Sequence, residues 1–195
     1  HMELQEHCYS VLLVSASEKF NQSLMSLLPE ERYSPVTIAA DVASARRQLL
    51  ESRFDIVVIN APVADDFGTR LALDLCRDSA TGVLLLVKAE HYPDISARVS
   101  PCGVLTLPKP TSAQLVTQTM QLLCGTCERL RRMAQKTASL EEKMEDIRII
   151  NHAKWLLIDQ LKMTEAQAHR YIEKQAMDRC VSRREIAENI LSTYK

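Results

Sequence analysis

The sequence predicts an α/β doubly wound domain built on a five-stranded parallel sheet, followed by an all-α region. Three observations support this prediction. Short apolar runs alternate with helical patterns over the first 120 or so of the 195 residues. Gly125 is the last glycine and Pro110 the last proline, which permits a long helix beyond them. Two segments near the C-terminus then carry helix start signals. A chain of this length is long enough for one ordinary domain and a smaller module.

The five strands are expected where short runs of β-branched residues or leucine interrupt the helical patterns. Continuous apolar runs of this kind are typical of a sheet that is buried on both faces. They occupy residues 9–15, 36–40, 55–60, 83–87 and 104–107. The helical segments between them complete the repeating unit of a parallel sheet. In such a sheet the functional crevice lies at the carboxyl ends of the strands.

The residues at these strand ends resemble those of a response-regulator receiver domain, a flavodoxin-like fold. The resemblance covers residues 9–124. It is carried by FDIVVIN at 54–60, DFG at 66–68 and LPKP at 107–110. It implies four chemical groups in a working domain: an acidic pair for Mg²⁺ after the first strand, a phosphoacceptor aspartate after the third, a hydroxyl after the fourth and a lysine after the fifth.

This chain keeps only the last of those four groups. Ser15 and Ser17 stand where the acidic pair is expected, so hard oxygen ligands for Mg²⁺ are missing. Asn60 occupies the phosphoacceptor position, and its amide cannot form an aspartyl phosphate. Lys88 replaces the hydroxyl, while Lys109 remains. We therefore expect a degenerate phosphorylation pocket that holds no metal and no cofactor and is not phosphorylated in the usual way.

This pseudo-receiver domain, bounded at residues 3–123, has two interpretations. It either senses a regulatory protein or a small ligand, or it only positions or dimerises the region that follows. Charge sets the two regions apart. Residues 1–124 carry 10 Lys and Arg against 14 Asp and Glu, whereas residues 125–195 carry 14 against 11. The positive C-terminal region fits phosphate contacts, and a solvated helical face has the same composition.

A linker helix is expected at residues 124–150, because side chains at the a/d spacing of a coiled coil run through it. The pattern favours a homodimer, and the alternative is a single amphipathic helix packed on its own domain. Its positions are Leu130, Met133, Thr137, Leu140, Met144, Ile147, Asn151, Lys154, Ile158 and Leu161. Cys124 and Cys127, at its start, have metal or redox spacing, but no second pair completes a zinc site. The other interpretation of this pair is a helix junction.

Residues 151–195 are expected to form a helical module. Capping boxes at 164–167 and 182–185 predict helices at about 165–178 and 183–193. The ordered series that includes Ala153-Lys154, residues 163–168 and residues 182–190 resembles the ANTAR family, the C-terminal module of AmiR/NasR-type transcription antitermination regulators. Trp155 departs from the family, which usually has glycine there. The resemblance implies binding to hairpins in nascent leader RNA.

Candidate RNA-binding residues in this module share a positive charge or an aromatic ring. Cations suit phosphates or bases, and aromatic rings stack on unpaired bases. The aromatic candidates are Tyr171 and Trp155, and both rings also fit core positions. Lys154 also fits a purely structural role. Arg183 and Arg184 lie in a first helical turn, where the dipole disfavours cations, which argues for a purpose beyond helix stability. The candidates are Lys154, Arg170, Tyr171, Arg179, Arg183 and Arg184.

These features predict a cytoplasmic, non-enzymatic transcription antitermination regulator that binds leader-transcript hairpins as a dimer. The sequence has no run long enough to span a membrane, no secretion signal, no paired catalytic carboxylates and no glycine-rich phosphate loop. Six cysteines without a secretion signal indicate reduced thiols. The alternative is a protein-interaction adaptor whose coiled coil and helical module bind a partner protein. The adaptor predicts that Arg183→Ala and Arg184→Ala leave RNA affinity unchanged.

Overall fold

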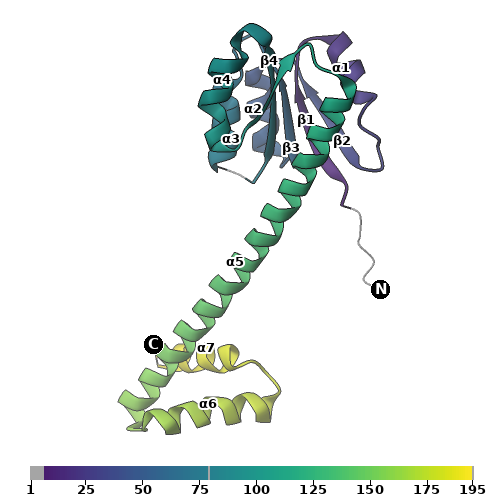
Figure 1. Cartoon of the computed structure of the whole chain (residues 1–195). Coiled ribbons are helices and arrows are strands. Elements are labelled where there is room, and N and C mark those ends of the chain that lie inside the picture. Colours follow the sequence, from purple (N-terminus) through teal and green to yellow (C-terminus); the bar gives the residue numbers. More distant parts are fainter. Residues whose placement is uncertain (1–6, 79, 195) are drawn as a thin grey trace. The chain divides into compact units, whose positions relative to one another are not determined.

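A computed structural model describes residues 7–78 and 80–194 and divides the chain into two compact units, with the division between Arg132 and Met133 (Figure 1). Residues 3–6 of the expected first domain and residue 195 of the expected third lie outside the described residues. The expected linker helix is part of a longer helix, α5 (Ala113–Leu161). The expected boundaries after residues 123 and 150 therefore fall inside one helix. The division between the two compact units lies between these two positions.

The first unit contains the predicted five-stranded parallel sheet, with strand order β2-β1-β3-β4-β5. Each predicted strand is present, and its ends agree with the prediction to within three residues. The α/β doubly wound fold is therefore confirmed. The strands are β1 (Tyr9–Val14), β2 (Tyr33–Ala39), β3 (Ile56–Asn60), β4 (Gly82–Lys88) and β5 (Leu105–Lys109).

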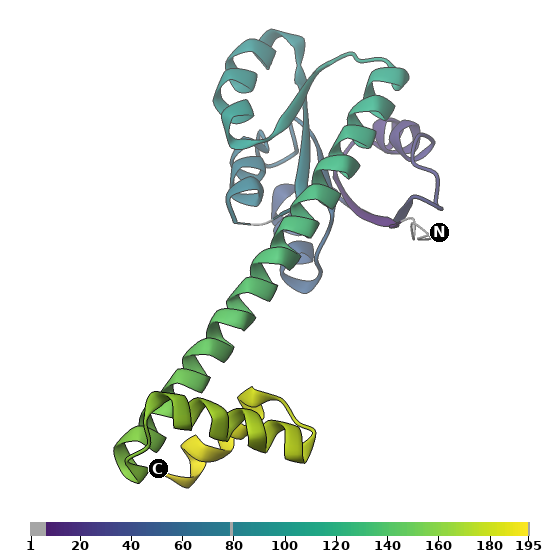
Figure 2. The same cartoon turned by 60° about the horizontal axis from the view of Figure 1, so that its bottom comes forward.

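Helices cover both faces of this sheet, which explains why its central strands are apolar throughout. One face packs against α1 (Glu18–Met25) and the first turns of α5 through a core that includes Leu24 and Met120 (Figure 2). The other face packs against α2 (Val42–Glu51), α3 (Thr69–Asp78) and α4 (Tyr92–Val99). Two short 3₁₀ turns, η1 (Ala89–His91) and η2 (Ser100–Cys102), flank α4.

Cys124 and Cys127 are part of this core. Both side chains are buried in α5, and their thiols donate to the Tyr33 hydroxyl (3.5 Å) and to the Asp55 carbonyl (3.3 Å), respectively. Burial raises the pKa of the Cys127 thiol to about 11. A Cβ atom on Gly82 would lie 2.8 Å from the Cys127 sulfur, so the sheet and helix meet closely here. The pair therefore packs α5 on the sheet. The expected helix junction is not present, because α5 continues through both residues.

The second unit packs the end of α5 against α6 (Glu165–Arg179) and α7 (Arg183–Thr193). The predicted bounds of both helices are correct to within one residue. Thr164 forms both hydrogen bonds of its capping box, and the Ser182 hydroxyl accepts from the Glu185 backbone amide (3.1 Å). Small side chains let the helices approach closely around a core of Ala153, Leu157, Ala168, Ile172, Ala176, Ile186, Ala187 and Ile190.

The predicted coiled-coil positions of α5 divide into two groups. The earlier apolar positions are exposed, whereas Ile158 packs against the core of the second unit and the Lys154 side chain is only 16% exposed. The seam therefore does not continue as a free apolar surface to Leu161. We call the exposed positions Leu130, Met133, Leu140, Met144 and Ile147 the α5 stripe. Within the described ranges, no helix combines the length and apolarity that crossing a membrane requires.

Candidate functional site

The carboxyl edge of the sheet brings together three residues of the predicted degenerate pocket. The Asn60 amide nitrogen donates to the Ser15 hydroxyl (3.2 Å). The Lys109 ammonium donates to the Asn60 amide oxygen (2.7 Å) and to the Ala61 carbonyl. Asn60 ends β3 and Lys109 ends β5, two strands away, so the lysine reaches over the end of β4. These side chains form one hydrogen-bonded chain.

This arrangement does not suit the chemistry of a working receiver domain. The Ser15 side chain is fully buried, and Asn60 is 8% exposed. The groups facing each other are a hydroxyl, an amide and an ammonium, whereas Mg²⁺ is usually held by one or two carboxylates together with several waters. Burial, and then the nearby Lys88 cation, lower the pKa of Lys109. The donor set therefore does not fit a divalent metal, and no step of a phosphoryl transfer can be assigned to it.

The remaining predicted pocket residues, Ser17 and Lys88, have peripheral positions. The Ser17 hydroxyl caps α1 by accepting from the Phe20 amide (3.3 Å), and the Ser17 amide donates to the Ser15 hydroxyl (3.2 Å). Lys88 is exposed at the end of β4 and lies beside Lys109 in the strand register. Ser17 therefore stabilises the start of α1. Lys88 contributes a positive charge to the carboxyl edge of the sheet.

A carboxylate of the loop that follows β3 also has a structural contact. Asp65 accepts hydrogen bonds from the backbone amides of Val42 (2.8 Å) and Ala43 (3.1 Å), at the start of α2. A carboxylate at a helix N-terminus is stabilised by the unpaired amides and the helix dipole. Asp65 therefore orders the β3–α3 loop against α2, and sequence reasoning did not identify this contact.

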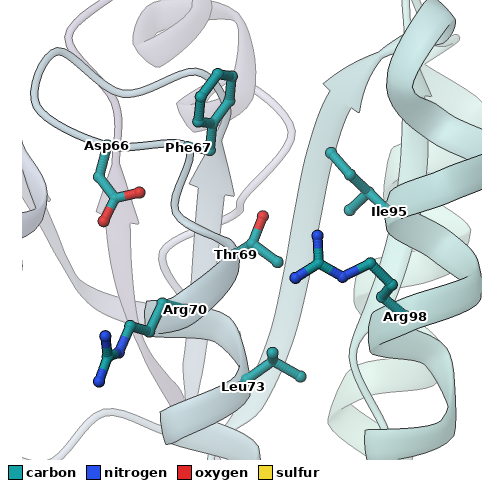
Figure 3. A pocket seen from close by; sticks show the side chains of 7 residues that line it. All are labelled: Asp66, Phe67, Thr69, Arg70, Leu73, Ile95 and Arg98. Carbon is teal, nitrogen blue, oxygen red and sulfur yellow. The ribbon is translucent and has the colours of Figure 1, made fainter.

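A separate hollow of about 400 Å³ lies between α3 and α4 in the first unit (Figure 3). The Arg98 guanidinium extends from α4 toward the side of Thr69, while the Arg70 guanidinium points away from it. Phe67 is 61% exposed at the rim. Sequence reasoning missed this hollow, because its lining comes from a loop and two helices. The lining residues are Asp66, Phe67, Thr69, Arg70, Leu73, Ile95 and Arg98.

In the second unit, three of the five predicted RNA-binding cations have acidic partners. The Arg184 guanidinium contacts Asp146 (2.8 Å) and Glu188 (2.9 Å). Hydrogen bonds to these two carboxylates raise the pKa of Arg184. Lys154 lies 3.6 Å from Glu165. Arg183 lies 3.5 Å from Glu173 on the neighbouring helix. These cations therefore connect α5, α6 and α7, whatever else they bind.

Arg170, Tyr171 and Arg179 form the other group. All three are exposed on α6. Within residues 7–78 and 80–194, neither guanidinium has a hydrogen-bond or ion-pair partner. Tyr171 and Arg179 line one hollow of about 200 Å³. Their separation of eight residues places them on one helix face, two turns apart.

Other residues of this hollow were not predicted. Gln175 lies between Tyr171 and Arg179 on the same face of α6, so helical spacing could have identified it. Asn189, Thr193 and Tyr194 come from the other side of the helical hairpin. No local sequence signal links them to α6, because the packing of α7 brings them there.

Comparisons with known proteins agree with this division of the chain. Residues 138–191 match the model of the ANTAR domain. Over 184 residues the chain is 25% identical to the "Transcriptional regulatory protein PdtaR" of Mycobacterium tuberculosis, covering 94% of this chain and 89% of that protein. This similarity extends over both units.

Solved structures resemble the first unit. The signal receiver domain of an HD domain-containing protein from Pseudomonas fluorescens Pf-5 matches with a TM-score of 0.57 and 21% identity, covering 64% of this chain and 93% of that chain. The chemotaxis response regulator CheY4 of Vibrio cholerae matches with a TM-score of 0.51 and 23% identity, covering 60% and 99%, respectively. The chain therefore combines a first unit that has the fold of receiver domains with a C-terminal region that matches the ANTAR domain.

Proposed function

We propose that this protein is a transcription antitermination regulator that binds hairpins in nascent leader RNA as a homodimer. The observation that carries this proposal is that Tyr171 and Arg179 are exposed together at one hollow of α6, inside the region that matches the ANTAR model. Arg170 adds an exposed cation on the opposite face of the same helix. The similar mycobacterial protein carries the name of a transcriptional regulator. Binding to nascent transcripts places the proposed activity in the cytoplasm and requires no enzymatic step.

The chemistry of this surface suits a hairpin loop. Loops expose unstacked bases together with closely spaced phosphates. An arginine without an internal ion pair can contact a phosphate or a base without first breaking a protein contact. Tyr171 offers an exposed aromatic ring that borders the same hollow as Arg179. Arg183, which has one 3.5 Å contact, supplies a further cation close to this helix.

The α5 stripe supports the proposed homodimer. Its five apolar side chains follow coiled-coil spacing and are exposed in a single chain. Burying each of them against a second copy contributes about 1.5–3 kcal/mol. Thr137 interrupts the stripe at one position, and polar residues at such positions set the register of a coiled coil. A dimer would present two ANTAR domains to two hairpins of one transcript.

The proposed role of the receiver-like domain is regulation without the usual phosphorylation. The hydrogen-bonded chain of Ser15, Asn60 and Lys109 supports this, because it contains no carboxylate nucleophile. The regulatory input is then a partner protein or a small ligand. Incubation with acetyl phosphate and Mg²⁺ tests this point. Acid-labile phosphate on the chain would contradict it, whereas unchanged mass supports it.

Gel shifts with the full chain test RNA binding. The probe is a pool of RNAs with two stem-loops, fixed stems and randomised loops, and the affinity of selected members is measured at several salt concentrations. We expect log affinity to fall with log salt concentration with a slope of about −0.7 for each phosphate contacted. Arg170→Gln combined with Arg179→Gln should make that slope shallower. If the chain binds no RNA of the pool, the proposed function is contradicted.

The competing function is a protein-interaction adaptor. Its supporting observation is the exposure of two large apolar side chains on the second unit, Trp155 (64%) and Met177 (77%). An adaptor would bind its partner through these side chains and would be indifferent to the loss of arginine charge. RNA affinity that survives neutralisation of Arg170, Arg179, Arg183 and Arg184 together would favour this second function.

A further inference from the structure

The hollow on the second unit has the layout of a small ligand site. All three helices of the unit line it, and its volume is about 200 Å³. This volume is below the range of about 300–1,000 Å³ that is typical of sites for drug-sized ligands. Its occupant is therefore a small group rather than a peptide helix. The lining residues are Leu157, Leu161, Tyr171, Gln175, Arg179, Ile186, Asn189, Ile190, Thr193 and Tyr194.

The base of this hollow is apolar, and two aromatic residues border it. Leu157, Ile186 and Ile190 are buried and belong to the core of the unit. Tyr171 on α6 and Tyr194 after α7 are each about 40% exposed, so their rings are partly available to a ligand. A flat group with aromatic faces can gain contacts with both rings and with this apolar base.

Polar groups line the same hollow. The side-chain amides of Gln175 and Asn189 each offer both donors and an acceptor. Within the described ranges, neither amide has a hydrogen-bond partner, so both are available to a ligand. Arg179 adds a guanidinium that has no partner within those ranges either. Neutral amides suit a group with alternating donors and acceptors, and the arginine suits an adjacent anion.

We propose that this hollow, the α6–α7 pocket, binds a single unpaired nucleobase from the loop of an RNA hairpin. The inference rests on the proposed function and adds the point of base recognition. The base lies against Tyr171 and Tyr194, the amides of Gln175 and Asn189 bond to its polar edge, and Arg179 contacts the phosphate of the same nucleotide. This combination of stacking and edge recognition is how proteins read splayed-out bases in single-stranded RNA.

The pocket also explains why a tyrosine is present at an exposed position of α6. Tyr171 belongs to a helix whose core side chains are Ala168, Ile172 and Ala176, on the adjacent face. The unit core is complete without it, because Tyr171 is absent from the buried cluster. The side chain is therefore available for a ligand at little cost to folding.

An abasic scan of a bound hairpin tests this inference with the full chain. The probe is one stem-loop selected from the randomised-loop pool, resynthesised with an abasic site at each loop position in turn. We expect one position to show a large loss of affinity with the native chain, about 5- to 150-fold for the loss of one stacked base. Tyr171→Ala should weaken the intact hairpin by a similar factor and should abolish the further loss at that position only. Tyr171→Phe, which keeps the ring, should retain the effect.

Met177→Ala is the matched control, because Met177 is exposed on the same helix and does not line the pocket. It should leave the whole abasic profile unchanged. A 2-aminopurine base at the sensitive position should change its fluorescence on binding to the native chain and not on binding to Tyr171→Ala.

Three results would overturn the inference. If the hairpin binds and Tyr171→Ala preserves every abasic penalty, the base lies elsewhere, although RNA binding stands. If sedimentation shows that Tyr171→Ala changes the oligomeric state, the pocket receives a second copy of the chain. If the native chain binds no stem-loop of the pool, the proposed function fails and this inference fails with it.

Discussion

The two units of this protein use their polar residues in opposite ways. In the receiver-like unit, Ser15, Asn60 and Lys109 hydrogen-bond to one another. In the ANTAR unit, Arg170 and Arg179 are exposed and have no such partner within the described ranges. Polar groups that already satisfy one another gain little from an incoming ligand, whereas unpaired ones exchange only water. The comparison teaches that the exposed arginines of α6 are better suited to an anionic ligand than the hydrogen-bonded chain of Ser15, Asn60 and Lys109.

The two units also differ in the size of their cores. The sheet of the first unit buries large aliphatic side chains on both faces. Four of the eight buried core residues of the second unit are alanines. Small domains bury a lower fraction of their surface, so their stability depends on a few large side chains. We therefore expect the second unit to be the less stable one.

The largest expected effect is the loss of the second unit through its core. Leu157→Ala removes a side chain that is 1% exposed and should lower the free energy of unfolding of this unit by about 2–5 kcal/mol. Thermal unfolding followed by circular dichroism should lose the helical transition of this unit and retain that of the first. Trp155→Ala, at an exposed position of the same helix, is the control. Equal destabilisation of both units would contradict the expectation that their separate cores unfold independently.

The next effect concerns the α5 stripe. Leu140→Asp places a charge in the proposed seam of each protomer and should weaken the dimer by at least about 100-fold, because two buried leucines are lost. Sedimentation velocity measures the change. Ser139→Asp adds the same charge next to the seam and should preserve the dimer. A native chain that remains monomeric at high concentration would exclude the seam altogether.

A smaller effect distinguishes the paired from the unpaired arginines. Arg179→Gln should make the salt dependence of RNA affinity shallower by about 0.7, the contribution of one phosphate contact, without changing the melting temperature. Arg184→Gln should lower the melting temperature and leave the salt dependence unchanged, because it leaves Asp146 and Glu188 without their partner. Filter binding at several salt concentrations and thermal unfolding measure the two quantities. If the two variants exchanged behaviour, our assignment of Arg184 to helix packing would be wrong.

The smallest effect is a pH dependence at the start of the linker region. Hydrogen bonds from Arg131 and Arg132 lower the pKa of Glu128 from 4.5 to about 2. A carboxyl whose folded pKa is lowered stabilises the fold above its unfolded pKa and loses that stabilisation as the pH falls toward the folded value. We therefore expect Glu128→Gln to flatten the fall in stability between about pH 4.5 and 2. These two surface ion pairs contribute little in total, so urea unfolding at several pH values is the suitable measurement.

The elements of the fold could be predicted because their signals are local. Strand runs and capping boxes identified β1 to β5, α6 and α7 to within a few residues. The length of α5 and the position of the division between the units could not be predicted. Both depend on which neighbours the helix buries, and Cys124 and Cys127 pack into the core of the first unit.

The candidate sites show the same limit. The residues of the degenerate pocket were predicted from their positions at strand ends, and three of them do meet. Their hydrogen bonds, however, require β1, β3 and β5 to align at one edge. In the ANTAR unit, Tyr171 and Arg179 could be identified by residue type. The contact of Arg184 with Glu188 follows i,i+4 spacing within α7, but its contact with Asp146 could not be predicted, because Asp146 lies on α5.

By itself the sequence determined the periodic elements, the missing acidic groups of the receiver-like domain and the excess of positive charge in residues 125–195. Each depends on residue identity or on spacing within a few turns of the chain. Only the tertiary structure decided which cations are paired between helices and how Tyr171, Gln175 and Asn189 come to border one pocket. Those outcomes depend on contacts between residues distant in sequence, which form only when packing aligns their helices and strands.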